Sequence, residues 1–157
     1  MRRAIVLAAL AAAAPAMAQE GARDRATVLM SEAPQGRGFQ DRYGYADAVV
    51  IDGTIYMSGV VVGLAGEGDT LDKAYDRAFR AMGRTLERAG AGWRDVVDIT
   101  SYHTDLPAQL DAMAAVKGRY ITAPFPAWTA IQVTRLVPDN GLTEIKLVAR
   151  MPRAGGR

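Results

Sequence analysis

Few side chains in this sequence combine the types and the spacing that chemistry requires. Glu144 lies in the segment LTEIK, where the alternation of a β-strand places Leu142, Glu144 and Lys146 on one face. A carboxylate in a dry cleft can act as a general base or position a water molecule. The same glutamate can equally be an ordinary strand residue paired with Lys146. The residues alone therefore leave the role of Glu144 open.

Other reactive side chains lack partners at a useful spacing. His103 is the only histidine, and we expect it to be a strand-end residue with a solvent contact. Ser58 precedes Gly59 without a surrounding G-x-S-x-G motif, so we expect a loop hydroxyl that lines a cleft. Asp95 and Asp98 are expected at the entrance of a strand rather than at an acid/base site. Because the chain has no cysteine, thiolate catalysis, disulfides and Cys-ligated metal sites are excluded.

The N-terminus has the pattern of a secretory signal peptide over residues 1–18. A positive head, Met1-Arg2-Arg3, precedes an uncharged Ala/Leu-rich run that ends in the small-x-small site Ala16-Met17-Ala18. The run is shorter than the ~20 residues that a membrane-spanning helix needs, which favours cleavage after Ala18 over an anchor. We therefore expect a periplasmic or secreted protein with no membrane segment after cleavage.

Charge and composition limit the function classes. Removal of residues 1–18 takes away two arginines and lowers the formal net charge from +2 to 0. A neutral chain without a basic patch is not expected to bind nucleic acid, because phosphate contacts dominate such binding. The length of 157 residues suits one domain, and a hydrophobic content of 50% can build its core.

The elements in the first half of the chain follow from its hydrophobic periods. Residues 19–42 are polar and Gly-rich except for 27–30, and we expect an N-terminal arm with one short strand. Strands over 48–51 and 54–58 flank Asp52-Gly53, which indicates a tight hairpin. The Gly-rich segment 59–69 matches no phosphate-binding motif and is expected to be a loop. Apolar residues at steps of three and four predict a helix over 70–89, capped by Asp69 or Thr70.

The second half alternates in the same way. We expect a strand over 96–104, a helix opened by Asp105-Leu-Pro107, and two strands over 127–136 and 142–151 that form a closing hairpin. The tail over 152–157 is expected to be flexible. This order predicts an α+β domain over 43–151, with a mixed sheet and two helices on one face. Apolar residues left on the other face predict an oligomer.

Several segments, taken in order, resemble the motifs of a known family. Tyr43-Gly-Tyr45 resembles the start of its GPYSQAV motif, and Ile55-Tyr-Met-Ser-Gly59 resembles its strand that ends in Ser-Gly. The helix and strand over 78–90 and 93–100 resemble its central segment, and Phe125-Pro-Ala127 and Thr143-Glu-Ile145 resemble its closing strands. Over about residues 43–151, the chain is thus similar to the RidA/YjgF/YER057c family, also called endoribonuclease L-PSP-like.

This resemblance implies a chorismate-mutase-like α+β fold and a homotrimer with small-molecule pockets between its subunits. For the archetypal members it implies hydrolysis of reactive enamines and imines to 2-oxo acids and ammonia, without a cofactor or a metal. It also implies site roles. Glu144 matches the glutamate thought to position water or polarise the imine, and Tyr45, Ser58 and Gly59 match positions that bind the substrate.

Trp128 is where this chain departs from the family. In PFPAWTAIQ it stands at the position of an arginine that clamps the substrate carboxylate in archetypal members. An indole has one N–H donor and no charge, so it cannot replace a bidentate guanidinium. We expect Trp128 at a subunit interface or in a pocket wall rather than in the plain core, and Arg150, Arg119 or a neighbouring subunit's Arg42 as candidates for the missing charge.

Three functions stay open at this point. The first is an exported enamine or imine deaminase, a hydrolase that uses Glu144 with an altered substrate anchor. The second is a non-catalytic trimer that binds a small molecule, and the third is a ribonuclease or chaperone-like role that is sometimes attached to the family. The loss of the arginine and the expected export weaken the hydrolase, and the missing basic patch argues against RNA binding. We still place a divergent hydrolase before pure binding.

Overall fold

The structure is a computed structural model that describes residues 20–152. In chain order its elements are η1 (Ala22–Arg25), β1 (Thr27–Leu29), α1 (Pro34–Tyr43), β2 (Ala48–Ile51), β3 (Thr54–Met57), β4 (Val60–Val62), α2 (Leu71–Arg88), η2 (Trp93–Asp95), β5 (Val96–His103), α3 (Leu106–Tyr120), β6 (Ala127–Gln132) and β7 (Thr143–Arg150). The expected signal peptide over 1–18, and the tail beyond Pro152, lie outside the described residues.

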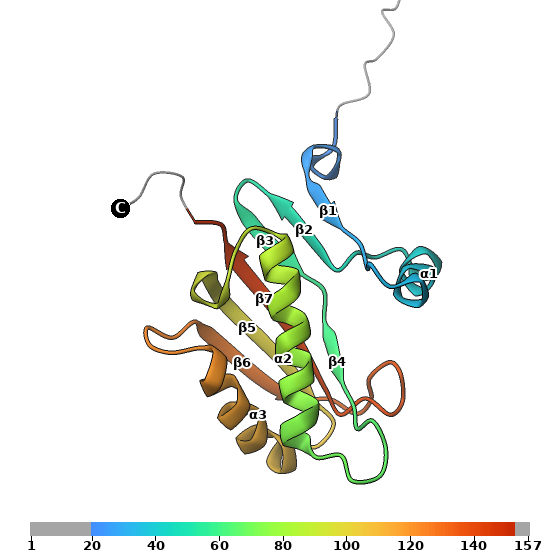
Figure 1. The fold of residues 1–157 in the computed structure, drawn as a ribbon, viewed down its shortest axis with the longest axis vertical. Coiled ribbons are helices and arrows are strands. Elements are labelled where there is room, and N and C mark those ends of the chain that lie inside the picture. The colour runs from blue at the N-terminus through green and yellow to red at the C-terminus, as the bar shows by residue number, and fades with distance from the viewer. Residues whose placement is uncertain (1–19, 153–157) are drawn as a thin grey trace, which may run out of the picture.

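The strands form one mixed sheet in the order β1-β2-β3-β7-β5-β6 (Figure 1). β4 pairs with the first residues of β7, whereas β3 pairs with its last residues. The long strand β7 is therefore central, with β3 and β4 along one edge and β5 along the other. The expected hairpin between β2 and β3 is confirmed, and Asp52 and Gly53 turn it with φ of 49° and 71°. Among the strands of residues 20–152, only β5 and β6 run parallel, because α3 connects them as a crossover.

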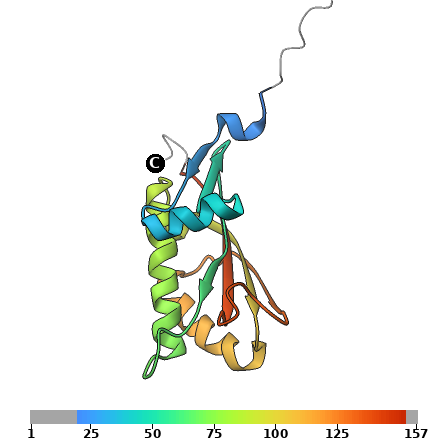
Figure 2. The ribbon, with the colours of Figure 1, turned by 90° about the vertical axis from the view of Figure 1, so that its right-hand side faces the viewer.

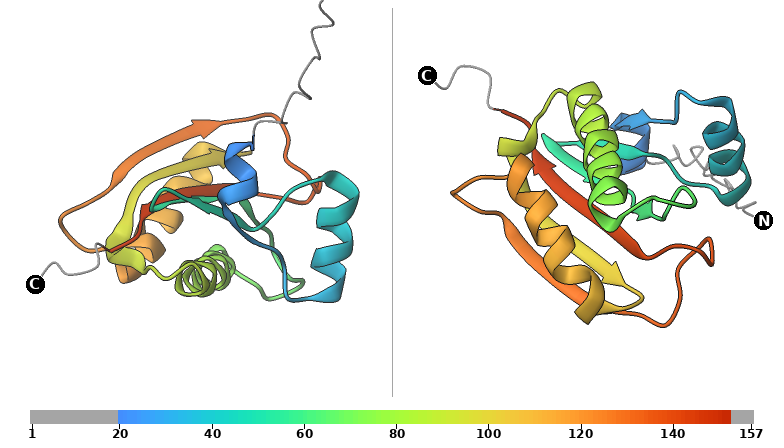
Figure 3. Two further views of the ribbon diagram at one scale, coloured as in Figure 1. Left: turned by 90° about the horizontal axis from the view of Figure 1, so that it is seen from above. Right: turned by 60° about the horizontal axis from the view of Figure 1, so that its bottom comes forward.

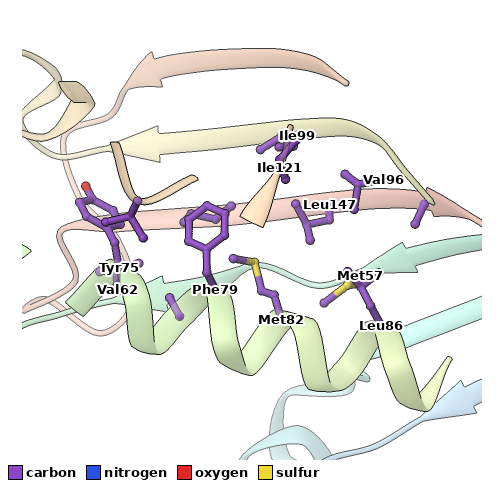
Figure 4. Close-up of a cluster of buried hydrophobic side chains, with 14 of the residues drawn as sticks. Met57, Val62, Tyr75, Phe79, Met82, Leu86, Val96, Ile99, Ile121 and Leu147 are labelled. Carbon is purple, nitrogen blue, oxygen red and sulfur yellow. The ribbon is translucent and has the colours of Figure 1, made fainter. Parts of the chain in front are cut away.

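Two long helices cover one face of the sheet, as expected, and the opposite face is left open (Figure 2). α2 begins after Thr70, whose hydroxyl accepts a hydrogen bond from the amide of Lys73, and Gly90 follows its end with a φ of 80°. Between these helices and the sheet lies the core. In Figure 4 the α2 residues Phe79, Met82 and Leu86 point toward residues of the sheet, which include Ile99 and Leu147. All five are fully buried.

Three expectations about the strands are wrong. β6 and β7 do not form a closing hairpin, because β5 lies between them and hydrogen-bonds to both. β6 also ends at Gln132 rather than at residue 136. Within the segment expected to be a loop, Val60–Val62 form β4 against β7. Three residues inside a Gly-rich stretch are too few to show a strand period, so only the pairing with β7 reveals β4.

The N-terminal arm contains the expected strand, β1, and also a helix that the sequence pattern did not reveal. α1 begins with Pro34 and ends where Gly44 adopts the left-handed conformation, with a φ of 69°. It has no apolar stripe facing the core, and it lies apart from α2 and α3, beyond the edge of the sheet (Figure 3). Within residues 20–152, no helix is long and apolar enough to cross a membrane.

Candidate functional site

A cavity of about 600 Å³ lies where α1, the start of β4, the loop before β7 and β7 itself meet. Four of the expected site residues line it: Tyr45, Ser58, Gly59 and Glu144. The remaining lining residues, which are aromatic or apolar, are Phe39, Tyr43, Val61, Val137 and Pro138. The structure thus brings together one carboxylate, the hydroxyl of Ser58, two tyrosine phenols and a largely apolar wall.

Glu144 is positioned by the alternation of β7. Its neighbours Thr143 and Ile145 are fully buried under the helices, so the side chain of Glu144 points to the opposite face and is only partly buried. Across the sheet it is paired with Val61 of β4 on one side and Tyr102 of β5 on the other. The carboxylate is therefore held on a central, rigid strand at the wall of the cavity.

Gly59 leaves the space that this carboxylate occupies. A Cβ atom at Gly59 would overlap the carboxylate of Glu144, with its Cδ only 2.5 Å away. Ser58 lies at the other side of the same corner, where its hydroxyl donates to the carbonyl of Ala46 at 2.7 Å and its amide to the carbonyl of Asp47 at 2.9 Å. The Ser-Gly pair thus brings the chain of β3 and β4 close to Glu144.

Tyr45 also lines the cavity, and it directly precedes Ala46 and Asp47, whose carbonyls accept the hydrogen bonds of Ser58. Burial, and then the negative charge of Asp47, raise the pKa of the Tyr45 phenol above its ordinary value. The phenol therefore stays protonated at neutral pH and can donate a hydrogen bond to a ligand. The aromatic wall is completed by Phe39 and Tyr43 of α1, which the expected arm did not include as pocket residues.

α1 is held over the cavity by polar contacts of a buried glutamine. The side chain of Gln40, 2% exposed, accepts from the amide of Ser31 at 2.8 Å and donates to a carboxylate oxygen of Asp47 at 2.6 Å. Arg88, at the end of α2, lies 3.4 Å from the other oxygen of Asp47 and donates to the carbonyl of Met30 at 2.6 Å. The aromatic wall is thereby tied to the core helix.

Trp128 lies elsewhere in the same chain. Its indole nitrogen donates to the hydroxyl of Ser101 at 3.0 Å, and the ammonium of Lys117 lies 4.5 Å from its ring centroid. Both partners belong to the side of the sheet that α3 covers, and the half-buried ring packs against the core. Within one chain, the structure does not bring Trp128 and Glu144 into one site.

The hydrogen bond of Trp128 leads into a buried polar network that the sequence pattern did not predict. Ser101 contacts Nε2 of His103 at 2.9 Å, and Nδ1 of His103 contacts the hydroxyl of Thr143 at 3.2 Å. Thr143 also contacts the phenol of Tyr75 at 2.7 Å. His103 is fully buried, so its expected solvent contact is wrong, and burial lowers the pKa of its imidazole. The only available signal was the alternation that puts Ser101 and His103 on the inner face of β5.

The candidate arginines do not supply a clamp within one chain. Arg119 pairs with Asp72 on the helix side, and Arg150 donates to the hydroxyl of Thr54. Arg42 lies over the ring of Tyr43, with its Cζ 5.3 Å from the centroid, but does not line the cavity. Among residues 20–152, no group of three His, Cys, Asp or Glu side chains is arranged to hold a metal ion.

Comparison with known proteins places this geometry in a family. The profile of the family described as "Endoribonuclease L-PSP" matches residues 38–151, which is most of the chain. The chain belongs to the RidA/YjgF family. A crystal structure of Rv2704 from Mycobacterium tuberculosis, described as a member of the YjgF/YER057c/UK114 family, superposes with a TM-score of 0.68 at 26% identity. The superposed region covers 80% of this chain and 99% of the Rv2704 chain.

Two curated relatives bear on the function of this RidA/YjgF protein. The RutC family protein YjgH of Escherichia coli is 41% identical over 76 residues, which cover 48% of this chain and 56% of that protein. The 2-iminobutanoate/2-iminopropanoate deaminase of Capra hircus is 33% identical over 110 residues, which cover 67% of this chain and 78% of that protein. The expected α+β fold and family are thus confirmed.

Proposed function

We propose that the cavity around Glu144 binds a small molecule and that this RidA/YjgF protein hydrolyses imines or enamines there. The observation that carries the proposal is the carboxylate of Glu144 in one cavity with Tyr45, Ser58 and Gly59. Further support comes from the relatives of this chain that are named 2-iminobutanoate/2-iminopropanoate deaminase.

The chemistry requires only a water molecule and a base. Glu144 accepts a proton from water as its oxygen attacks the imine carbon, and that proton is returned to the nitrogen. In the resulting carbinolamine, Glu144 transfers the hydroxyl proton to the amino group. The C–N bond then breaks as the C=O bond forms, and ammonia leaves. The phenol of Tyr45 donates a hydrogen bond to the bound ligand. Overall, one imine and one water molecule give one carbonyl compound and one ammonia molecule.

A second candidate is a non-catalytic small-molecule-binding protein. It is favoured by the absence of any lysine or arginine from the residues of this chain that line the cavity. A 2-imino acid carries a carboxylate, which such a cavity does not neutralise. Binding without turnover is therefore the alternative outcome of the same experiment.

The assembly and the location are also proposals. A homotrimer is supported by apolar side chains on the open face of the sheet, where Tyr56 and Ile131 are 49% and 43% exposed. Export to the periplasm or beyond is supported by the N-terminal pattern of residues 1–18.

The test generates imines in situ from several amino acids with an amino-acid oxidase and follows the release of 2-oxo acid. The native protein should accelerate release, and Glu144→Gln should reduce the acceleration roughly 100-fold or more, as for the loss of a general base. Glu87→Gln, on the exposed side of α2, is the matched control and should match the native rate. Equal rates for native protein, Glu144→Gln and buffer would exclude the hydrolase and leave the binding protein.

A further inference from the structure

The charge of the Glu144 cavity indicates which ligands it can hold. The residues of this chain that line it include one carboxylate and no lysine or arginine. Within residues 20–152, Glu144 takes part in no ion pair within 4.0 Å. Lys146 lies on the same face of β7, two residues further along, and does not line the cavity. The negative charge at the wall is thus available to a ligand.

Three aromatic rings stand around the same space. Phe39 and Tyr43 have ring centroids 4.4 Å apart with an interplanar angle of 43°, and Phe39 and Tyr45 lie 6.1 Å apart at 83°. Phe39, Tyr43 and Tyr45 are 45%, 56% and 40% exposed, so packing within the chain leaves part of each ring accessible to a ligand. Rings that meet at steep angles can offer faces to one ligand from several directions.

Aromatic faces and a carboxylate favour the same kind of ligand. The face of an aromatic ring carries a negative quadrupole, which attracts an organic cation within about 6 Å and repels an anion. The ring of Tyr43 already attracts a cation, because the guanidinium of Arg42 lies over it at 5.3 Å. A carboxylate ligand would have to approach both these faces and Glu144, and none of the residues of this chain that line the cavity carries a compensating positive charge.

We infer that this cavity binds a small organic cation, a substituted ammonium or iminium group, held by the carboxylate of Glu144 and the rings of Phe39, Tyr43 and Tyr45. This inference rests on the proposed function only in using the same cavity, and it requires no turnover. It makes α1 the element that determines specificity, because Phe39 and Tyr43 both belong to that helix.

Three probes of one shape separate charge from size. Choline carries a trimethylammonium head, 3,3-dimethylbutan-1-ol is its neutral isostere, and 3,3-dimethylbutanoate is an anion with the same tert-butyl head. In a proton NMR titration of the purified protein, the choline methyl signal should move upfield through the ring currents of the aromatic wall. Choline should bind about tenfold more tightly than the alcohol, and the anion more weakly than both.

Variants assign the effect to the cavity. Glu144→Gln and Phe39→Leu should each weaken choline binding about fivefold or more. Glu144→Gln should change the affinity for the neutral alcohol by no more than about twofold. Arg42→Gln should bind choline at least as well as the native protein, because a competing cation is removed. Phe125→Leu is the control: Phe125 is 71% exposed, lies outside the cavity and should not affect binding.

The outcomes distinguish this inference from the proposed hydrolase. Equal affinity for choline and the alcohol, or tighter binding of the anion, would overturn the cation site whether or not imines are hydrolysed. Choline binding that Glu144→Gln and Phe39→Leu leave unchanged would also overturn it, because the cation would then bind elsewhere. Selective choline binding that both variants weaken supports the inference even if no imine is turned over.

Discussion

The indole nitrogen of Trp128 donates a hydrogen bond to the hydroxyl of Ser101 at 3.0 Å, under α3. Trp128, which the resemblance puts at the position of the family arginine, is therefore part of the packing of β5 and β6 within its own chain. Its ring is also covered by Lys117, whose pKa burial lowers. Within this chain, Trp128 therefore has a structural role that is independent of any ligand.

Trp128→Phe should destabilise the protein without removing the cavity. Phenylalanine keeps most of the apolar contact but cannot donate to Ser101, which costs about 1 kcal/mol for a lost hydrogen bond. Urea unfolding of native and variant proteins measures the difference. A variant as stable as the native protein would show that the bond contributes nothing net, and a loss of several kcal/mol would show a packing role beyond it.

Gly59→Ala should abolish ligand binding at the cavity with little change in stability. The new methyl group would overlap the side chain of Glu144 from its carboxylate back to Cγ, so this side chain has to rotate out of the cavity wall. Ligand binding by NMR and urea unfolding report the two effects separately. Gly118→Ala in α3 is the matched control, because nothing lies within 4 Å of its Cβ position. It should leave binding intact and stabilise the chain by up to about 1 kcal/mol. Unchanged binding in Gly59→Ala would place the ligand away from Glu144.

Arg88→Ala should loosen α1 from the core helix. The side chain of Arg88 joins the end of α2 to Asp47 and to the carbonyl of Met30. If the substitution lowers the free energy of local unfolding of α1 by about 1 kcal/mol, the locally unfolded population rises roughly fivefold. Trypsin should then cleave after Arg37 or Arg42 about fivefold faster. Arg84→Ala, exposed on the same helix, is the control. Equal cleavage rates in the two variants would contradict the anchoring role.

His103 should make the protein less stable in acid. Burial lowers the pKa of its imidazole in the folded chain, while in the unfolded chain the pKa is about 6.5. Below about pH 6.5 the unfolded chain therefore binds a proton that the folded chain does not, and the free energy of unfolding falls by at most ~1.4 kcal/mol per pH unit.

His103→Gln isolates this contribution, because glutamine keeps hydrogen-bonding groups but does not titrate in this range. Urea midpoints at pH 7.5 and pH 5.5 are compared in the native protein and in the variant. The native protein should lose more stability between the two values than His103→Gln does. The same loss in both would mean that other groups carry the acid sensitivity.

The fold was accessible from local patterns wherever an element carries a clear period or a strong turn. The α2 stripe of Phe79, Met82 and Leu86 and the turn at Asp52-Gly53 are of this kind. α1 and β4 were not accessible, because a short polar helix and three valines have no period to detect. Their stability comes from Gln40 and from the pairing with β7.

The sequence by itself determined the family, the two long helices and the candidate role of Glu144, because these depend on residue type and spacing along one chain. Only the tertiary structure decided what lies around that glutamate. The close approach of Gly59, the aromatic wall of α1 and the turning of Trp128 toward Ser101 arise from contacts between residues far apart in sequence. Such contacts depend on the direction in which each side chain leaves its strand and on which distant segment packs against it. The local sequence does not determine that segment.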